Sequence, residues 1–141
     1  MSKQTVLVAV YGTLKKGEPN HRLLSDSEFV GKGHTLPNFD LVEMGSFPGA
    51  IKGNQSLTVE VYSVDYNTTF PNLDLLEGHP HFFERHMADI ILTDHGDLPI
   101  KAWLYAIYHL APQYKASKRC TTKDKNGNIN WSYHTSVLNR G

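Results

Sequence analysis

The sequence has one cysteine, no long apolar segment and no excess of charge of either sign. Because Cys120 stands alone, it can form neither an internal disulfide nor a metal site built only from cysteines. The apolar run after the N-terminus, Val6 to Val10, has only five residues, whereas a secretory signal needs about 7–15 and a membrane span about 20. We therefore expect a cytoplasmic protein with no membrane partner.

The composition is that of an ordinary globular domain. The 141 residues include 14 basic and 14 acidic side chains, which give a net charge of zero, and this balance argues against nucleic acid as a partner. Eleven glycines and seven prolines are too few for a low-complexity chain. A chain of this length is expected to form one domain with a sizeable core, and we expect it to be a monomer.

The neutral total conceals a difference between the two ends of the chain. Residues 1–112 carry a net charge of −5, whereas residues 113–141 contain six basic residues and one acidic residue and carry +5. We interpret 1–112 as the functional domain and 113–141 as a basic C-terminal tail. Three interpretations of the tail stay open, namely a polar segment packed on the acidic domain, a flap over a functional site, or an arm that binds nucleic acid.

Short apolar and β-branched segments dominate the pattern of the chain. Strands are predicted over 4–11, 56–64, 83–92 and 99–109, with two short, bent strands within 28–44 and a turn at 46–49. In the segment 56–64, Leu57, Val59 and Val61 alternate with polar residues, as in a strand with one buried face. A short helix is predicted to begin near Pro19, and another of about two turns to run from Thr68 to Gly78. The pattern favours an α+β fold with a curled sheet or small barrel.

The loop that follows the first predicted strand is a candidate binding site. Its glycines Gly12 and Gly17 are spaced as in a phosphate-binding P-loop, but Glu18 and Pro19 stand where that motif needs Lys and Ser or Thr. What remains is a tight loop whose backbone N–H groups could bind a carboxylate or an oxyanion without any particular side chain. The alternative is a simple turn.

Glu77 stands at the C-terminal end of the second predicted helix. The helix dipole disfavours negative charge there, and packing among Leu73 and Leu76 would bury the carboxylate, so we expect its pKa to be raised toward neutrality. A carboxyl group with such a pKa can act as a general acid and base. The alternative is a solvated glutamate before the glycine that ends the helix, Gly78.

Other reactive side chains give weaker signals. His79, His81 and His86 lie within eight positions, but their spacing matches no metal motif and Pro80 interrupts any common face, so we predict no metal site. Lys118 and Arg119 should lower the pKa of Cys120, although a lone thiol in a polar tail is more simply incidental. Glu60 is either exposed or turned into a cavity, and the sequence does not decide between them.

Three motifs together resemble one known family. They are the run 11–17 with Pro19-Asn20 after it, the segment 60–62, and the segment Leu73 to Arg85 with the pattern Leu-Asp-x-Leu-Glu-Gly-His-Pro-x-x-Phe-x-Arg. In this order they resemble the γ-glutamylcyclotransferase-like (AIG2-like) superfamily, over roughly residues 5–110. The Thr-Leu-Lys-x-Gly-x-Pro-Asn version of the first motif is most similar to the γ-glutamylaminecyclotransferase branch.

The resemblance implies a small mixed β-barrel flanked by short helices and an enzyme without a cofactor. The implied reaction converts a γ-glutamyl amine to 5-oxoproline and releases the amine, with the α-amine of the substrate as the nucleophile. By the family pattern, Tyr11, Gly12, Thr13 and Leu14 bind the glutamyl group largely through their backbone, and Glu77 is the acid and base.

The chain departs from the family pattern at two positions, and other functions stay open. Val59 stands where the family often has Gly, and Phe83 where it commonly has Tyr, so no hydroxyl role can be assigned there. Arg85 matches the family, but whether it contacts substrate or braces the site is undecided. The alternatives are the same fold acting on γ-glutamyl dipeptides, glutathione or a γ-glutamylated carrier, and a binding module without catalysis.

Overall fold

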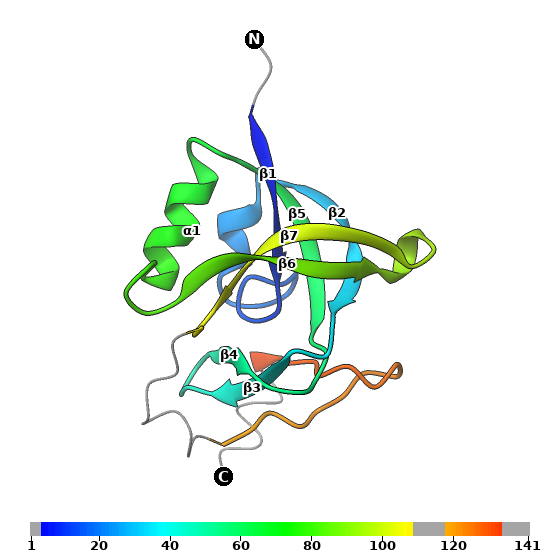
Figure 1. Ribbon diagram of the computed structural model, residues 1–141. Helices are drawn as coiled ribbons and strands as arrows, with labels where there is room; N and C mark the ends of the chain where they lie inside the picture. Colours follow the sequence, from blue (N-terminus) through cyan, green and yellow to red (C-terminus); the bar gives the residue numbers. More distant parts are fainter. Residues whose placement is uncertain (1–3, 109–117, 134–141) are drawn as a thin grey trace.

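The computed structural model describes residues 4–108 and 118–133 and contains a closed, mixed five-stranded barrel (Figure 1). β1 pairs antiparallel with β5 and parallel with β7, and the parallel pair closes the barrel. This architecture confirms the expected α+β fold with a small mixed barrel and short helices. In barrel order the strands are β1 (Thr5–Val10), β5 (Thr58–Asp65), β2 (Glu28–Thr35), β6 (Glu84–Leu92) and β7 (Leu98–Ala106).

Strict alternation along the strands separates two apolar clusters. Val59 and Val61 of β5 belong to the same cluster as Ala102 and Leu104 of β7, together with Leu57 just before β5. The intervening residues of β5, such as Tyr62, belong to a second cluster that includes residues of the α-helix. The predicted alternation is therefore confirmed, because successive side chains of a strand point to opposite faces and both faces are covered here.

The helices are few and short, as expected, although the first begins later than predicted. The α-helix α1 (Thr69–Glu77) ends at Gly78, whose φ of 66° lies in the left-handed region that favours glycine. The first helix is a 3₁₀ turn, η1 (His21–Leu24), which begins later than predicted because hydrogen-bonded turns occupy the segment before it. Another 3₁₀ turn, η2 (Thr93–His95), joins β6 to β7. No helix in these described ranges is long and apolar enough to cross a membrane.

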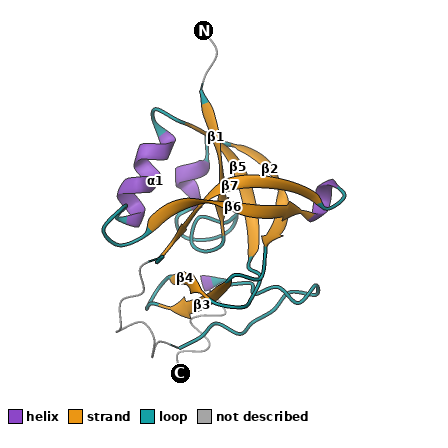
Figure 2. Cartoon of the chain, in the orientation of Figure 1, coloured by secondary structure: helices purple, strands orange, loops and turns teal. Residues whose placement is uncertain are grey.

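A two-stranded sheet lies beside one end of the barrel (Figure 2). It consists of β3 (Phe39–Glu43) and β4 (Pro48–Lys52). The sequence analysis did not predict β4 and placed a turn over 46–49. The turn lies two residues earlier, over 44–47, where Met44 N donates to Phe47 O at 2.9 Å, and Pro48 already pairs with Glu43 in the sheet.

Residues 118–133 of the basic C-terminal segment pack against this sheet and the barrel. A bridge joins Val42 to Arg119, and another joins Leu57 to Ile129. Ile129 and Trp131 are buried in the same cluster as the barrel core, and Trp131 is only 1% exposed. This part of the segment therefore contributes apolar side chains to the packed body of the protein.

Candidate active site

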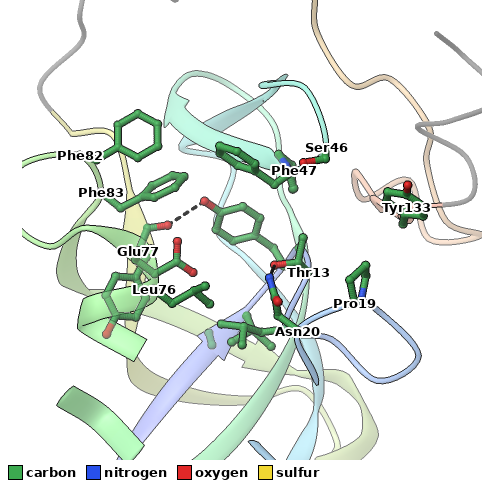
Figure 3. Close-up of a pocket in the computed structure, with 17 residues that line it drawn as sticks. Thr13, Pro19, Asn20, Ser46, Phe47, Leu76, Glu77, Phe82, Phe83 and Tyr133 are labelled. Atoms are coloured by element: carbon green, nitrogen blue, oxygen red, sulfur yellow. Dashed lines mark hydrogen bonds between the residues drawn. The ribbon is translucent and has the colours of Figure 1, made fainter. Parts of the chain in front are cut away.

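A pocket of about 450 Å³ opens beside the C-terminal end of β1 (Figure 3). It brings together the loop after β1, the end of α1, the β3–β4 turn and the last described residue of the chain. Glu77 and the four predicted binding residues, Tyr11 to Leu14, all line it. The seventeen lining residues are Ala9, Val10, Tyr11, Gly12, Thr13, Leu14, Pro19, Asn20, Ser46, Phe47, Pro48, Leu76, Glu77, Phe82, Phe83, Tyr105 and Tyr133.

The side chain of Tyr11 braces the pocket through its hydroxyl group. Tyr11 Oη donates to the carbonyl oxygen of Tyr105 at 2.8 Å and accepts from the backbone N–H of Ala50 at 3.0 Å. Burial, together with the nearby charge of Glu77, raises the pKa of Tyr11 well above its usual value. The neutral phenol therefore joins the end of β1 to β7 and β4, and its proton is already engaged in a hydrogen bond.

The loop after Tyr11 lines the pocket and carries backbone N–H groups. Within the described ranges, the N–H groups of Gly12, Thr13 and Leu14 donate to no acceptor of the protein. Asn20 shapes this loop, because its Nδ2 donates to Thr13 Oγ1 at 2.9 Å and its backbone N–H donates to Thr13 O at 2.8 Å. Unpaired N–H groups on a fixed loop suit a carboxylate or a developing oxyanion.

Gly12 is required at this position by close packing. A Cβ atom on Gly12 would lie 2.7 Å from Cγ of Pro48, the first residue of β4. Such a contact is too short for a real Cβ, and the proline ring cannot rotate away. The loop can therefore approach β4 only because residue 12 has no side chain.

Glu77 is the last residue of α1 and directs its carboxylate into the pocket (Figure 3). The helix ends there, as the sequence predicted, and the side chain is half-buried. Burial raises its pKa to about 7, which agrees in direction with the sequence-based expectation. Leu76, one of the two leucines expected to pack around Glu77, lines the same pocket and is 41% exposed. At neutral pH this carboxyl group can both accept and donate a proton.

An ion pair behind the pocket fixes the orientation of α1. Arg85 Nε donates to Asp74 Oδ1 at 2.8 Å, and Arg85 Nη2 donates to Asp74 Oδ2 at 3.2 Å. The hydroxyl group of Tyr105 donates to the same Asp74 Oδ1 at 2.6 Å. Although burial alone would raise the pKa of Asp74, these hydrogen bonds outweigh it and lower that pKa. Arg85 therefore braces the helix that carries Glu77 and does not line the pocket.

The sequence analysis missed Asp74 and Tyr105 as positioning residues. Asp74 stands three positions before Glu77, so the two share one side of the helix within about a turn. That spacing was a usable signal, but the partners of Asp74 come from β6 and β7. The pairing of β6 with β7 sets Arg85 opposite Tyr105, and both residues meet Asp74 there.

Glu60 supports the loop after β1 from outside the pocket. Its Oε1 accepts hydrogen bonds of 2.8 Å from both the backbone N–H of Lys16 and the hydroxyl group of Tyr62. Glu60 is half-buried and is not among the residues that line the cavity. Glu60 is therefore neither fully exposed nor turned into this cavity, the two alternatives that the sequence left open, and it anchors the loop.

The remaining reactive residues lie elsewhere. In the described part of the chain, no group of three or more His, Cys, Asp or Glu side chains is arranged to hold a metal ion. His79 packs against Tyr105, and His86 stacks on Tyr108. The expectation that basic neighbours lower the pKa of Cys120 was wrong in direction, because burial raises it.

Comparison with known proteins identifies the family. Residues 8–131 match the family described as "Gamma-glutamyl cyclotransferase, AIG2-like". The chain belongs to this family. The match extends beyond residue 112 into the basic segment, where Ile129 and Trp131 are buried.

Relatives and solved structures agree with this assignment. A protein of Vibrio cholerae named "Putative gamma-glutamylcyclotransferase" is 42% identical over 99 residues, which cover 70% of this chain and 79% of that protein. A protein of the same description from Methanocaldococcus jannaschii is 40% identical over 101 residues, covering 70% and 81%. The crystal structure of an AIG2-like protein from Mus musculus superimposes with a TM-score of 0.74 at 26% identity, covering 91% of this chain and 96% of that one.

Proposed function

We propose that the protein converts a γ-glutamyl amine to 5-oxoproline and releases the free amine, with Glu77 as general acid and base. One observation carries this proposal. A carboxyl group whose pKa is about 7 shares a pocket with a loop whose backbone N–H groups, at Gly12, Thr13 and Leu14, donate to no acceptor in residues 4–108 and 118–133. The first can move protons at neutral pH, and the second can hold an anionic part of the substrate. The family of the chain and the names of its relatives support the same reaction class.

The reaction begins with the substrate α-amine in its ammonium form. Ionised Glu77 accepts one proton, and the freed nitrogen attacks the γ-carbonyl carbon, so that a C–N bond closes a five-membered ring. Protonated Glu77 then donates its proton to the leaving nitrogen, and the C–N bond to the amine breaks. The ring nitrogen loses its second proton to Glu77, which passes it to the released amine. The products are 5-oxoproline and an ammonium ion, with protons and charge balanced.

The pocket contributes to this reaction in three ways. Folding the flexible glutamyl chain so that nucleophile and carbonyl meet can supply up to about 7–11 kcal/mol of the barrier. Each loop N–H that meets the developing oxyanion is typically worth about 3–4 kcal/mol. Proton transfer through Glu77 adds about 10²–10⁴-fold in rate. No nucleophilic side chain is required, because the substrate supplies its own.

The direct test is release of 5-oxoproline measured by mass spectrometry. The substrates are γ-glutamyl-ε-lysine, γ-glutamylalanine and glutathione, and the variant is Glu77→Gln, which keeps the size of the side chain. We expect at least about 10²-fold slower release by the variant. Glu28→Gln, on the exposed start of β2, is the matched control and should keep the wild-type rate.

The outcomes separate the alternatives. Full turnover in folded Glu77→Gln would contradict the role given to this residue. Preference for γ-glutamylalanine or glutathione over γ-glutamyl-ε-lysine would assign the protein to peptides and not to amines. No release from any substrate by folded wild-type protein would favour a γ-glutamylated carrier or a binding module without catalysis.

A further inference from the structure

The C-terminal segment forms the wall of the pocket that lies away from Glu77. Tyr133, 41% exposed, lines the cavity together with Pro19. Figure 3 shows Glu77 on one side of the pocket and Tyr133 on the other, beyond Pro19 and Asn20. The pocket therefore has a proton-transfer end at Glu77 and an outer end at Tyr133.

Polar contacts join this outer wall to the loop, buried or part-buried at Lys15 and exposed at Glu18. The Lys15 ammonium, which directly follows the loop residues, donates to Asn130 Oδ1 at 2.8 Å and to Trp131 O at 2.6 Å. The backbone N–H of Tyr133 donates to Glu18 Oε2 at 2.9 Å. Lys15 is 6% exposed and Trp131 is 1% exposed. These contacts consequently fix the position of Tyr133 relative to the loop after β1, which would hold the glutamyl part of a substrate.

The size and chemistry of the outer end indicate what it contacts. A cavity of about 450 Å³ is in the range that holds a drug-sized ligand, so a γ-glutamyl group, similar in size to one amino acid, leaves part of it unfilled. The outer part is lined by Pro19 and the ring of Tyr133, and the ring of Phe47 lies between them and the Glu77 side, where Figure 3 places Phe82. Such surfaces pack against carbon skeletons, and their burial is favourable.

The same wall offers little to an anionic leaving group. Among the described residues that line the pocket there is no lysine and no arginine. The nearby Arg22 is exposed and donates to the carbonyl oxygen of Pro19, but it is not part of the lining. A carboxylate placed on the leaving amine would lose hydration there without gaining a cationic partner, which is costly.

We propose that Tyr133 is a specificity-determining residue that packs against the substituent of the leaving amine. It selects γ-glutamyl derivatives of amines with apolar or aromatic substituents over γ-glutamyl amino acids. This inference rests on the proposed cyclotransferase function and adds to it the class of amine. The C-terminal segment is then part of the active site, fastened to the loop by Lys15.

The experiment compares three substrates that differ only in the leaving amine. These are γ-glutamyl methylamide, γ-glutamyl phenethylamide and γ-glutamylalanine, each assayed for 5-oxoproline release. For the wild type we expect kcat/KM to be highest for the phenethylamide. In Tyr133→Ala the ratio of kcat/KM for phenethylamide to methylamide should fall by about tenfold, mainly through KM. Tyr133→Phe, which keeps the ring, should retain most of the ratio.

A matched control and the contrary outcomes complete the test. Tyr66→Ala removes a tyrosine of similar exposure, 45%, that is not among the pocket residues, and should leave the ratio unchanged. An unchanged ratio in Tyr133→Ala, or a wild-type preference for γ-glutamylalanine, would overturn this inference while leaving the cyclotransferase function standing. No 5-oxoproline from any of the three substrates would overturn both.

Discussion

The ammonium of Lys15 lies 2.6 Å from the carbonyl oxygen of Trp131, although 116 positions separate the two residues in the chain. This contact joins the loop after β1 to the C-terminal segment, and a hydrogen bond of 2.8 Å to Asn130 reinforces it. Burial lowers the pKa of Lys15, while the nearby carboxylates Glu60 and Glu18 act in the opposite direction. One buried cation therefore holds two walls of the pocket together.

We expect Lys15→Met to destabilise the protein by about 1–3 kcal/mol, because the buried acceptors at Asn130 and Trp131 would lose their donor. Urea unfolding measures the difference. Lys16→Met is the control, since the side chain of Lys16 is exposed and only its backbone N–H is used, by Glu60. Equal unfolding midpoints for the two variants would show that the Lys15 contact contributes nothing to stability.

The activity should depend on pH through Glu77. The proposed mechanism needs this carboxyl group ionised at the start, and its pKa is about 7. We therefore expect kcat/KM to rise with pH, up to about tenfold per unit below pH 7, and to level off above it. Initial rates between pH 5.5 and 8 on one γ-glutamyl amide measure the profile. A flat profile over that range would contradict Glu77 as the base.

Glu77→Gln should be more stable than the wild type at alkaline pH. A carboxyl whose pKa rises from 4.5 to about 7 on folding stabilises the folded state fully only below pH 4.5, and this contribution is lost as pH rises through 7. The cost of the ionised form amounts to up to about 3 kcal/mol at pH 8. Glutamine carries no such cost.

The check is chemical unfolding of both proteins at pH 4.5 and pH 8. The difference in unfolding free energy between variant and wild type should be small at the lower pH and should favour the variant at the higher pH. A difference that is the same at both values would show that burial does not shift the pKa of Glu77.

Asp74→Asn should weaken the attachment of α1 to the barrel. The substitution removes the charge from the two hydrogen bonds of Arg85 and from the acceptor of Tyr105. We expect a loss of about 1–3 kcal/mol in unfolding free energy and a lower kcat, because Glu77 lies at the end of the same helix.

The matched control for that variant is Asp89→Asn. Asp89 pairs with Lys101 at 3.0 Å, but both side chains are more than half exposed, and such surface pairs contribute little. Unfolding and kinetics of the two variants should therefore differ clearly. If Asp74→Asn behaved like Asp89→Asn, the proposed brace would be ruled out.

Local sequence determined most of the elements. Alternation of apolar residues marked β5 and β7, and Gly78 marked the end of α1, because these signals depend only on the two-residue repeat of a strand and on the freedom of glycine at positive φ. The motif around Glu77 also placed that residue at a helix end. The predicted start of the first helix was wrong, because it depends on hydrogen bonds within the loop that the apolar pattern of the sequence does not reveal.

Only the tertiary structure decided how the pocket is assembled. The antiparallel pairing of β6 with β7 sets Arg85 opposite Tyr105, and both bond to Asp74 of α1. The contacts of Lys15 and Glu18 hold Trp131 and Tyr133 to the loop. These contacts join residues far apart in the chain, and their energies come from burial and from hydrogen bonds in low dielectric. The sequence by itself supplied the residues of the site, and long-range packing determined which of them meet.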